Sequence, residues 1–400
     1  MTNRSFSTTL SGMSNKAQSP SPTNFRAVQF LVLGAQFIFA LAANTIQPLL
    51  PTIQEELGLS IFASSALPTI YTVSLAFTNL AVGFFIGKLG IKRMILGAGI
   101  LGVLASLLAF LSPSFAVLTL AYIAYGFAIG SAFTSLTTLY SHLPERYRDF
   151  GLYHAFFGIG GIVAPLITGF VQNRGLDFHL IFLVYLILMF VSFLVFLLFP
   201  GLENRKYQNG SMGSMVKTLL GPLLIMGIAV MGTYAAAEIG IVTYAGNQHI
   251  GTYSTTPAQA SLVLSGFWVV FTLSRFITDP LARRFGTKTL VLACVGIAFL
   301  ALIGWILGAG VWTFLVIGLA LGPIFPAMQK FINNHLPDEK KGLFNGGTYA
   351  SLGAITSLVL PLMGSLGEGG IQRAFIPSAV CLILLFVLVP VVIRRLDNQP

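Results

Sequence analysis

The sequence predicts an all-α membrane protein whose twelve transmembrane helices form two pseudo-symmetric six-helix bundles. Three observations predict this fold class: an apolar composition, a series of twelve apolar stretches, and a pattern of charges and short motifs that repeats once along the chain. Of the 400 residues, 55% are hydrophobic and 8% are charged, whereas a soluble domain carries roughly 25% charged residues. Charges this sparse cannot cover a soluble globule of this size.

The twelve apolar stretches each have about the length, roughly 20 residues, that crosses a bilayer as a helix. Their approximate ranges are 27–50, 61–87, 94–112, 115–138, 151–171, 178–200, 218–246, 258–282, 289–308, 310–329, 343–366 and 371–393. The polar start of the chain predicts a disordered tail. The expected divisions are a cytoplasmic tail at 1–26, an N-terminal bundle at 27–200, a cytoplasmic linker at 201–217 and a C-terminal bundle at 218–395.

The distribution of Lys and Arg predicts the topology. With the amino terminus in the cytoplasm, 19 of the 22 Lys and Arg residues fall in cytoplasmic segments, while Arg174 and Arg373 fall in outer loops and Arg275 lies within the eighth span. Cytoplasmic loops carry an excess of Lys and Arg, so both termini are expected in the cytoplasm, with the chain in a plasma (inner) membrane. The bases lie in short clusters rather than in one stripe, so the net charge of +10 does not indicate nucleic-acid binding.

Two short motifs recur at nearly equal spacing and indicate an internal duplication. The segment 90–92 (Gly-Ile-Lys) recurs as 286–288 (Gly-Thr-Lys), an offset of 196 residues, and 142–145 (His-Leu-Pro-Glu) recurs as 335–338 (His-Leu-Pro-Asp), an offset of 193. Each motif stands at an equivalent place in a six-plus-six arrangement. Parallel repeats of six helices characterise one large class of secondary transporters.

The loop after the second span resembles the signature of the major facilitator superfamily. The segment 83–93 reads Gly-Phe-Phe-Ile-Gly-Lys-Leu-Gly-Ile-Lys-Arg, in which Gly83, Lys88, Gly90 and Lys92 match the family's pattern and Gly87 stands where its Asp usually sits. The segment 279–288 is similar, and its corresponding residues are Asp279, Arg283, Gly286 and Lys288. The resemblance covers about 27–395 and implies the major facilitator fold, with these loops gating the cytoplasmic side. Glycine permits the tight turn expected at residues 90 and 286.

Narrower resemblances leave the substrate class open. Segments 154–165 and 234–238 look like parts of the fucose–proton symporter branch of the superfamily. The stretch from 160 to 169 also resembles the glycine-proline motif of the drug–proton antiporters. One stretch of the fifth span therefore matches two branches with different substrates.

Glu238 is the leading candidate for a functional residue because it is the only carboxylate deep within a predicted span, past the middle of the seventh span and toward the outside. Intramembrane carboxylates usually face a bundle interior or a wet cavity and mark function. Tyr234, one turn earlier, could orient it. Asn44 and Gln47 share a face of the first span and could hydrogen-bond a substrate or join helices.

For the remaining candidates, the sequence favours a structural role over a functional one. Arg275 and Asp279 are spaced one turn apart and predict an internal ion pair near the cytoplasmic mouth. His154 near the end of the fifth span favours capping or packing over titration. The aromatic residues that could line a cavity, but more often serve packing, are Tyr122, Tyr125, Trp268 and Tyr349.

The absence of several motifs excludes other functions. There is no Gly-x-x-x-x-Gly-Lys-Ser/Thr loop for ATP, no His-Glu-x-x-His metal helix and no Gly-x-Ser-x-Gly elbow. Cys294 and Cys381 lie in apolar runs and predict neither a disulfide nor a metal site. No cofactor and no enzymatic activity are therefore expected.

The sequence thus favours a secondary active transporter that moves a small solute, such as a sugar-like compound, a metabolite or a drug, by alternating access. Glu238 favours proton coupling. The expected partners are a small-molecule substrate, protons and the lipid bilayer, and the expected state is a monomer. A facilitative uniporter of the same fold is the alternative, and a non-transporting receptor or a polytopic membrane enzyme is the alternative from another class.

Overall fold

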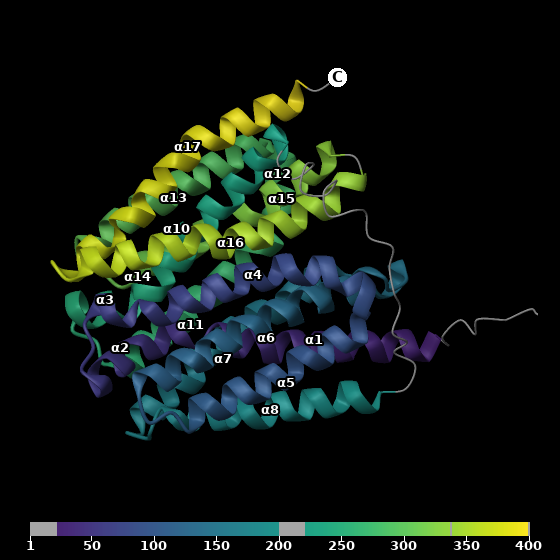
Figure 1. Cartoon of the computed structure of the whole chain (residues 1–400). Coiled ribbons are helices and arrows are strands. Elements are labelled where there is room, and N and C mark those ends of the chain that lie inside the picture. The colour runs from purple at the N-terminus through teal and green to yellow at the C-terminus, as the bar shows by residue number, and fades with distance from the viewer. Residues whose placement is uncertain (1–21, 200–220, 337, 399–400) are drawn as a thin grey trace, which may run out of the picture.

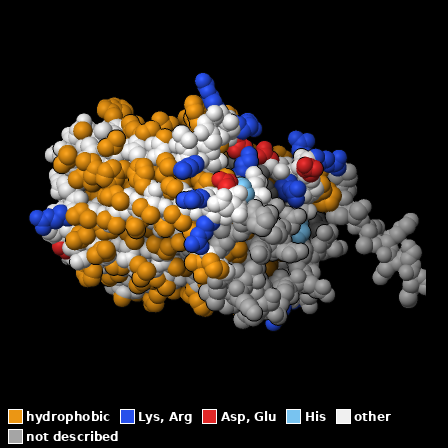
Figure 2. Space-filling view, turned by 90° about the horizontal axis from the view of Figure 1, so that it is seen from above, with side chains coloured by type: hydrophobic (Ala, Val, Ile, Leu, Met, Phe, Trp, Pro, Cys, Tyr) orange, Lys and Arg blue, Asp and Glu red, His pale blue; other side chains and the backbone are white. Residues whose placement is uncertain are grey.

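The computed structural model describes residues 22–199, 221–336 and 338–398. Within these ranges, twelve helical segments are long and apolar enough to cross a membrane, from Phe25–Leu57 to Ile371–Asp397. Large hydrophobic side chains such as Phe77, Leu198 and Leu358 are exposed, and Figure 2 shows hydrophobic side chains spread over most of the visible surface. The chain is therefore a multi-pass integral membrane protein with the predicted number of spans. The expected tail and linker fall mainly on residues 1–21 and 200–220, which lie outside the described residues.

The helices form two groups that correspond to the two halves of the chain (Figure 1). The first half comprises α1 (Pro22–Ala43), α2 (Ile46–Leu57), α3 (Ile61–Ser64), α4 (Ala66–Leu89), α5 (Ile91–Phe110), α6 (Phe115–Ser141), η1 (Glu145–Tyr147), α7 (Phe150–Asn173) and α8 (His179–Leu198). The second half comprises α10 (Pro222–Tyr253), α11 (Pro257–Phe276), α12 (Thr278–Phe285), α13 (Thr287–Ile306), α14 (Trp312–Leu321), α15 (Ile324–His335), α16 (Asp338–Gly367), η2 (Ile371–Phe375) and α17 (Ile376–Asp397).

Four of the expected spans are divided in the structure, including the second at Ser65 and the tenth at Gly322 and Pro323. The breaks in the first and the eighth span show how proline causes them. The first span divides at Asn44 and Thr45, and the eighth divides at Ile277. Pro48 and Pro280 lie four residues after Asn44 and Phe276, and proline has no N–H with which to close the helical hydrogen bond to those carbonyls. The side chain of Asn44 instead donates to the carbonyl of Ala40 at 2.8 Å.

Equivalent glycine turns follow α4 and α12, as the repeated motif predicts. Gly90 has φ 86° and joins α4 to α5, and Gly286 has φ 79° and joins α12 to α13. A side chain at such a φ would be strained, whereas glycine adopts it readily. Most visible Lys and Arg side chains gather toward one end of the molecule (Figure 2). We call the face that carries the two glycine turns and the end of α17 the basic face.

The two halves meet mainly through α7 against α11 and α4 against α16, with α10 also packed on α2. Three hydrogen-bonded contacts join the halves near the face opposite the basic one, and we call them the gate contacts. They link Asn247 to Gln54, the backbone N–H of Phe62 to the Glu368 carboxylate, and Ser261 to Gln172. Of the other hydrogen bonds that join the halves among the described residues, the one from Ser265 to Ile162 lies near the middle of the helices. The one from Asn79 to Tyr349 lies slightly to the basic-face side of the middle. Figure 1 shows the two groups diverging toward the end that carries the C-terminus. The structure is thus closed on the face opposite the basic one.

Candidate functional site

Glu238 lies at the middle of α10. The sequence placed it nearer the outer end of a span ending at 246, but α10 continues to Tyr253, so that prediction of depth was wrong. The preceding residues Ala235, Ala236 and Ala237 are buried, and Glu238 itself is half-buried. A partly accessible carboxylate at mid-helix fits a position beside an internal passage rather than in a packed core.

Arg275 supplies the positive charge that faces Glu238. Its guanidinium lies 4.4 Å above the ring of Phe271 and acts electrostatically on the Glu238 carboxylate. The predicted ion pair with Asp279 is wrong, because Asp279 pairs with Lys330 of α15. The break at Ile277 separates the two residues into α11 and α12, so they no longer share one helical face. Arg275 therefore interacts with Glu238 and His154 rather than with Asp279. Its Nε atom has no hydrogen-bond partner in the described part of the chain.

Tyr234 connects Glu238 and Arg275 to the end of α14. It is fully buried, and its hydroxyl donates to the carbonyl of Leu321 at 2.9 Å. The same hydroxyl also interacts with the side chains of Glu238 and Arg275. The predicted spacing of one turn therefore does bring Tyr234 and Glu238 together. Because the Tyr234 proton is directed to a backbone carbonyl, the hydroxyl oxygen is free to accept a hydrogen bond from Arg275.

His154 extends the site into the other half of the molecule. It lies on α7 and acts electrostatically with Arg275 on α11, which packs against α7. The ring of His154 lies 5.5 Å from that of Tyr153, whose hydroxyl donates to Gln36 at 2.8 Å. The structure thus places His154 beside the charged centre, in addition to the capping or packing expected for it.

Tyr349 on α16 completes the site. It interacts with Arg275 and with Gln329 on α15, and Gln329 donates to Asn345 at 3.2 Å. We call Glu238, Tyr234, Arg275, His154 and Tyr349 the central cluster. It combines one acid, one base and one imidazole with two phenols, contributed by α7, α10, α11 and α16. A carboxylate and a guanidinium attract each other more strongly in such a setting than in bulk water.

The other candidates lie outside the central cluster. Gln47 is buried with its side-chain oxygen unpartnered among the described residues, and the helix break at Thr45 interrupts the face that it was expected to share with Asn44. Tyr122 and Tyr125 pack with Phe182 inside the first half, where the Tyr125 hydroxyl donates to Ser106 at 2.9 Å. The two tyrosines therefore pack α6 against α8.

Trp268 and the residues of the predicted signature loops also lie outside the central cluster. Trp268 is buried at the contact between halves, where its ring lies 6.4 Å from that of Phe157. Lys92 donates to the carbonyl of Phe199 at 3.4 Å, which ties the start of α5 to the end of α8. Lys88, Arg283 and Lys288 are exposed on the basic face, and Gly83 lies within α4.

Sequence reasoning missed three polar residues near the central cluster: Gln36, Tyr153 and Gln329. Gln36 is a buried amide within an otherwise apolar stretch of the first span, and that isolation is the signal that could have identified it. Gln329 is the last residue of the predicted span 310–329, and nothing in its sequence position distinguishes it from other polar residues at helix ends. Within the described ranges, no group of three His, Cys, Asp or Glu residues is placed to hold a metal ion.

Comparison with known proteins gives the family of this transmembrane chain. The model of the Major Facilitator Superfamily matches residues 32–311 and 223–400. The chain belongs to the major facilitator superfamily. It is therefore a transporter of that family and not an enzyme, as the signature loop at residues 83–93 indicated.

Members of the superfamily with known activities resemble the chain to different degrees. The class H tetracycline resistance protein of Pasteurella multocida is 26% identical over 360 residues, which is 83% of this chain and 87% of that protein. The solved structure of a bacterial homologue of the human lysosomal transporter Spinster, in an inward-facing and unoccupied conformation, has a TM-score of 0.75 at 12% identity and covers 95% of this chain and 99% of its own. The outward conformation of FucP has a TM-score of 0.67 at 16% identity and covers 94% of this chain and 100% of its own. These two structures confirm the major facilitator fold.

Proposed function

We propose that the protein is a proton-coupled secondary transporter that exports a small organic solute by alternating access. The observation that carries the proposal is the central cluster, in which the Arg275 guanidinium acts electrostatically on the Glu238 carboxylate and on His154 of the other half. The basic face is assigned to the cytoplasm because Lys and Arg accumulate on that side of membrane proteins. On this assignment, the structure is the state closed to the outside, in the inner membrane of a bacterium.

The charges of the central cluster support exchange of a proton for substrate. With Glu238 ionised, Arg275 balances it. A substrate with an acidic group would compete for Arg275, and a substrate with a basic group would compete for Glu238. A basic substrate and a proton would therefore occupy the Glu238 carboxylate in turn, which gives exchange. An acidic substrate on Arg275 would instead bind together with a proton on Glu238, because a carboxylate freed of its partner inside the bundle is costly.

The two halves provide the movement that this exchange requires. Glu238 and Arg275 both belong to the second half, whereas His154 belongs to the first. Rocking of one half against the other would therefore keep the acid and the base together while changing the distance between His154 and Arg275. Opening of the outer side would also break the gate contacts. The site would thus meet one side of the membrane at a time, with a different electrostatic setting on each side.

Aromatic walls beside the charges favour a ring-bearing solute. The ring of Phe325 lies 6.1 Å from that of Tyr234 and 6.4 Å from that of Tyr349. The face of Phe271 is occupied by the Arg275 guanidinium. Similarity to the tetracycline resistance protein supports a drug-like substrate with several polar groups, and tetracycline is the first compound to test.

The experiment is transport in proteoliposomes across an imposed pH gradient. The purified protein is reconstituted, the lumen is made acidic, and uptake of tetracycline and of a panel of ring-bearing compounds with acidic or basic groups is followed. We expect at least one compound to accumulate above its external concentration, and the accumulation to disappear when an ionophore collapses the pH gradient. Uptake that reaches equilibrium without concentrating any compound would instead indicate a facilitative uniporter. Empty liposomes provide the background.

A further inference from the structure

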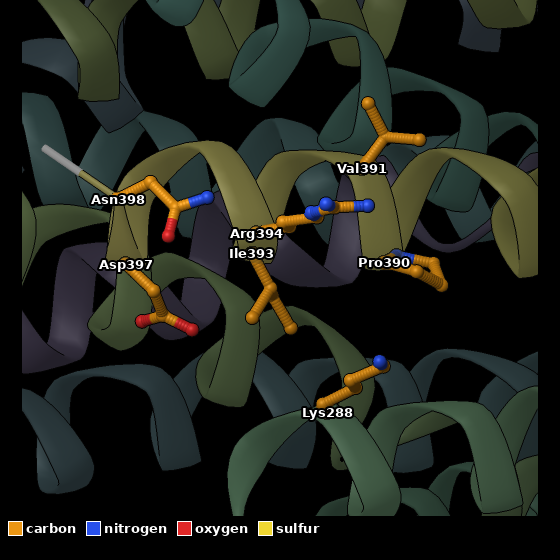
Figure 3. A pocket seen from close by; sticks show the side chains of 7 residues that line it. All are labelled: Lys288, Pro390, Val391, Ile393, Arg394, Asp397 and Asn398. Carbon is orange, nitrogen blue, oxygen red and sulfur yellow. The ribbon is translucent and has the colours of Figure 1, made fainter.

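A second candidate site lies on the basic face, where the end of α17 passes the start of α13. A cavity of about 420 Å³ opens there. Lys288 of α13 and Arg394 of α17 stand at it, together with the apolar side chains of Pro390, Val391 and Ile393 (Figure 3). None of the residues that line the cavity belongs to the central cluster.

The charge at this cavity is positive. Lys288 and Arg394 are both exposed, and no ion pair joins either of them to an acid in the described part of the chain. Asp397 also lines the cavity, but its carboxylate lies 3.5 Å from the imidazole Nε2 of His335 on α15. The cavity therefore presents two cations without described acidic partners, while its one acid is shared with a histidine.

The apolar part of the cavity continues into the surface that faces lipid. Val391 is exposed on α17, and Val387 and Phe386, about one turn earlier, are exposed as well. Arg394 therefore stands where the lipid-facing surface of α17 meets the charged end of the molecule. A molecule that fits both parts carries a negative charge at one end and hydrocarbon at the other.

We propose that this cavity binds an anionic phospholipid of the cytoplasmic leaflet. The phosphate lies between Lys288 and Arg394, and an acyl chain follows Pro390 and Val391 along α17. Basic pockets between transmembrane helices on the cytoplasmic side are suited to such headgroups. The cavity's volume of about 420 Å³ lies within the range of roughly 300–1,000 Å³ that small-molecule sites occupy. The bound lipid joins α13 to α17 and so stabilises the second half.

Lipid-dependent thermal stabilisation of the purified protein tests this site. The protein, in an uncharged detergent, is titrated with phosphatidylglycerol, with phosphatidylcholine, or with glycerol 3-phosphate, and its melting temperature is recorded at low and high salt. We expect phosphatidylglycerol to raise the melting temperature more than phosphatidylcholine, with the difference reduced by salt because the contact is electrostatic. Glycerol 3-phosphate should have no effect, because it lacks the chains. Equal stabilisation by phosphatidylcholine, or full stabilisation by glycerol 3-phosphate, would overturn the proposal.

Charge-neutralising variants locate the effect. A basic residue near an anionic membrane surface contributes roughly a fivefold gain in binding, so Lys288→Gln and Arg394→Gln should each weaken phosphatidylglycerol binding about fivefold, and the double variant about thirtyfold. Arg395→Gln is the matched control, since Arg395 is exposed on the neighbouring position of α17 but does not line the cavity. A double variant that binds as tightly as Arg395→Gln would refute the site.

A cross-linking experiment on the unaltered protein removes any dependence on how the variants fold. Phosphatidylglycerol with a photoreactive group near its headgroup is added, irradiated, and the modified peptides are identified. The proposal predicts labelling at the start of α13 and the end of α17, reduced by excess unlabelled phosphatidylglycerol. Labelling confined to other helices would contradict it.

Discussion

The contact between α4 and α16 offers a sharp test of how the two halves close. A Cβ atom on Gly353 of α16 would lie 2.5 Å from the carbonyl oxygen of Thr72 and 2.8 Å from the Cβ of Ala76, both on α4. Ordinary contact begins at 3.4 Å, so Gly353→Ala forces the two helices apart by up to about 0.9 Å. Overpacking of this kind costs about 1–3 kcal/mol, and that cost applies to the state closed at the gate contacts. In the alternate state α4 and α16 separate there and the extra methyl group is accommodated.

The expected result of Gly353→Ala is a shift toward the state open at the gate contacts. A difference of 1–3 kcal/mol corresponds to about a 5- to 150-fold change in the ratio of the two states. A cysteine placed at Gln54, which contacts Asn247 across the halves, should react with a maleimide in purified protein faster by a factor in this range. The native Cys294 and Cys381 are buried, and protein without the added cysteine gives their background.

Gly346→Ala is the matched control for this measurement. Gly346 lies on the same helix, and a Cβ atom there meets nothing within 4 Å. Its labelling rate should equal that of the unaltered protein. Equal labelling rates in Gly353→Ala and Gly346→Ala would refute the inference that close approach of α4 and α16 holds the outer side shut.

Three further predictions concern other parts of the molecule. The backbone N–H of Phe62 holds the pKa of Glu368 below its usual value of 4.5, so this gate contact persists above that pH and weakens as the pH falls through the lowered pKa. Relative to an exposed reference cysteine, which corrects for the loss of thiolate in acid, labelling at the gate should therefore rise in strongly acidic solution. Glu368→Gln should abolish that relative rise, whereas an unchanged relative pH profile would contradict it. His249 is buried among aromatic rings, and neither ring nitrogen has a hydrogen-bond partner in the described residues. His249→Phe should therefore raise the free energy of unfolding by about 1–3 kcal/mol, and with it the melting temperature, without altering transport. A lower melting temperature would show that His249 makes an essential hydrogen bond. Arg275→Ala should weaken substrate binding at least tenfold with little effect on expression, whereas Asp279→Ala should leave binding unchanged, and the reverse pattern would return Arg275 to a purely structural role.

The sequence predicted those features of the fold that depend on length and local chemistry. The twelve spans follow from the lengths of the apolar stretches, and the turns at Gly90 and Gly286 follow from the conformational freedom of glycine. The prediction that Tyr234 lies beside Glu238 also needed only a continuous helix. In each case, neighbours along the chain determine the geometry.

The features that the sequence did not predict depend on contacts between distant segments. The expected pairing of Arg275 with Asp279 assumed an unbroken helix, and Pro280 breaks it. The partners that Arg275 finds instead, Glu238 and His154, come from α10 and α7. Nothing in the spacing of one span indicates which face it turns toward another span, so the central cluster emerges only from the packing of separate helices.

Transport by Glu238→Gln is the measurement that tests the account most directly. Glutamine keeps the shape and hydrogen-bonding capacity of the side chain but cannot exchange a proton. In proteoliposomes, the variant should fail to accumulate substrate along a pH gradient while still binding it and exchanging labelled for unlabelled substrate. Glu145→Gln, the same change at an exposed position on the basic face, should behave as the unaltered protein. If Glu238→Gln still concentrates substrate with a normal response to the pH gradient, Glu238 does not couple protons to transport.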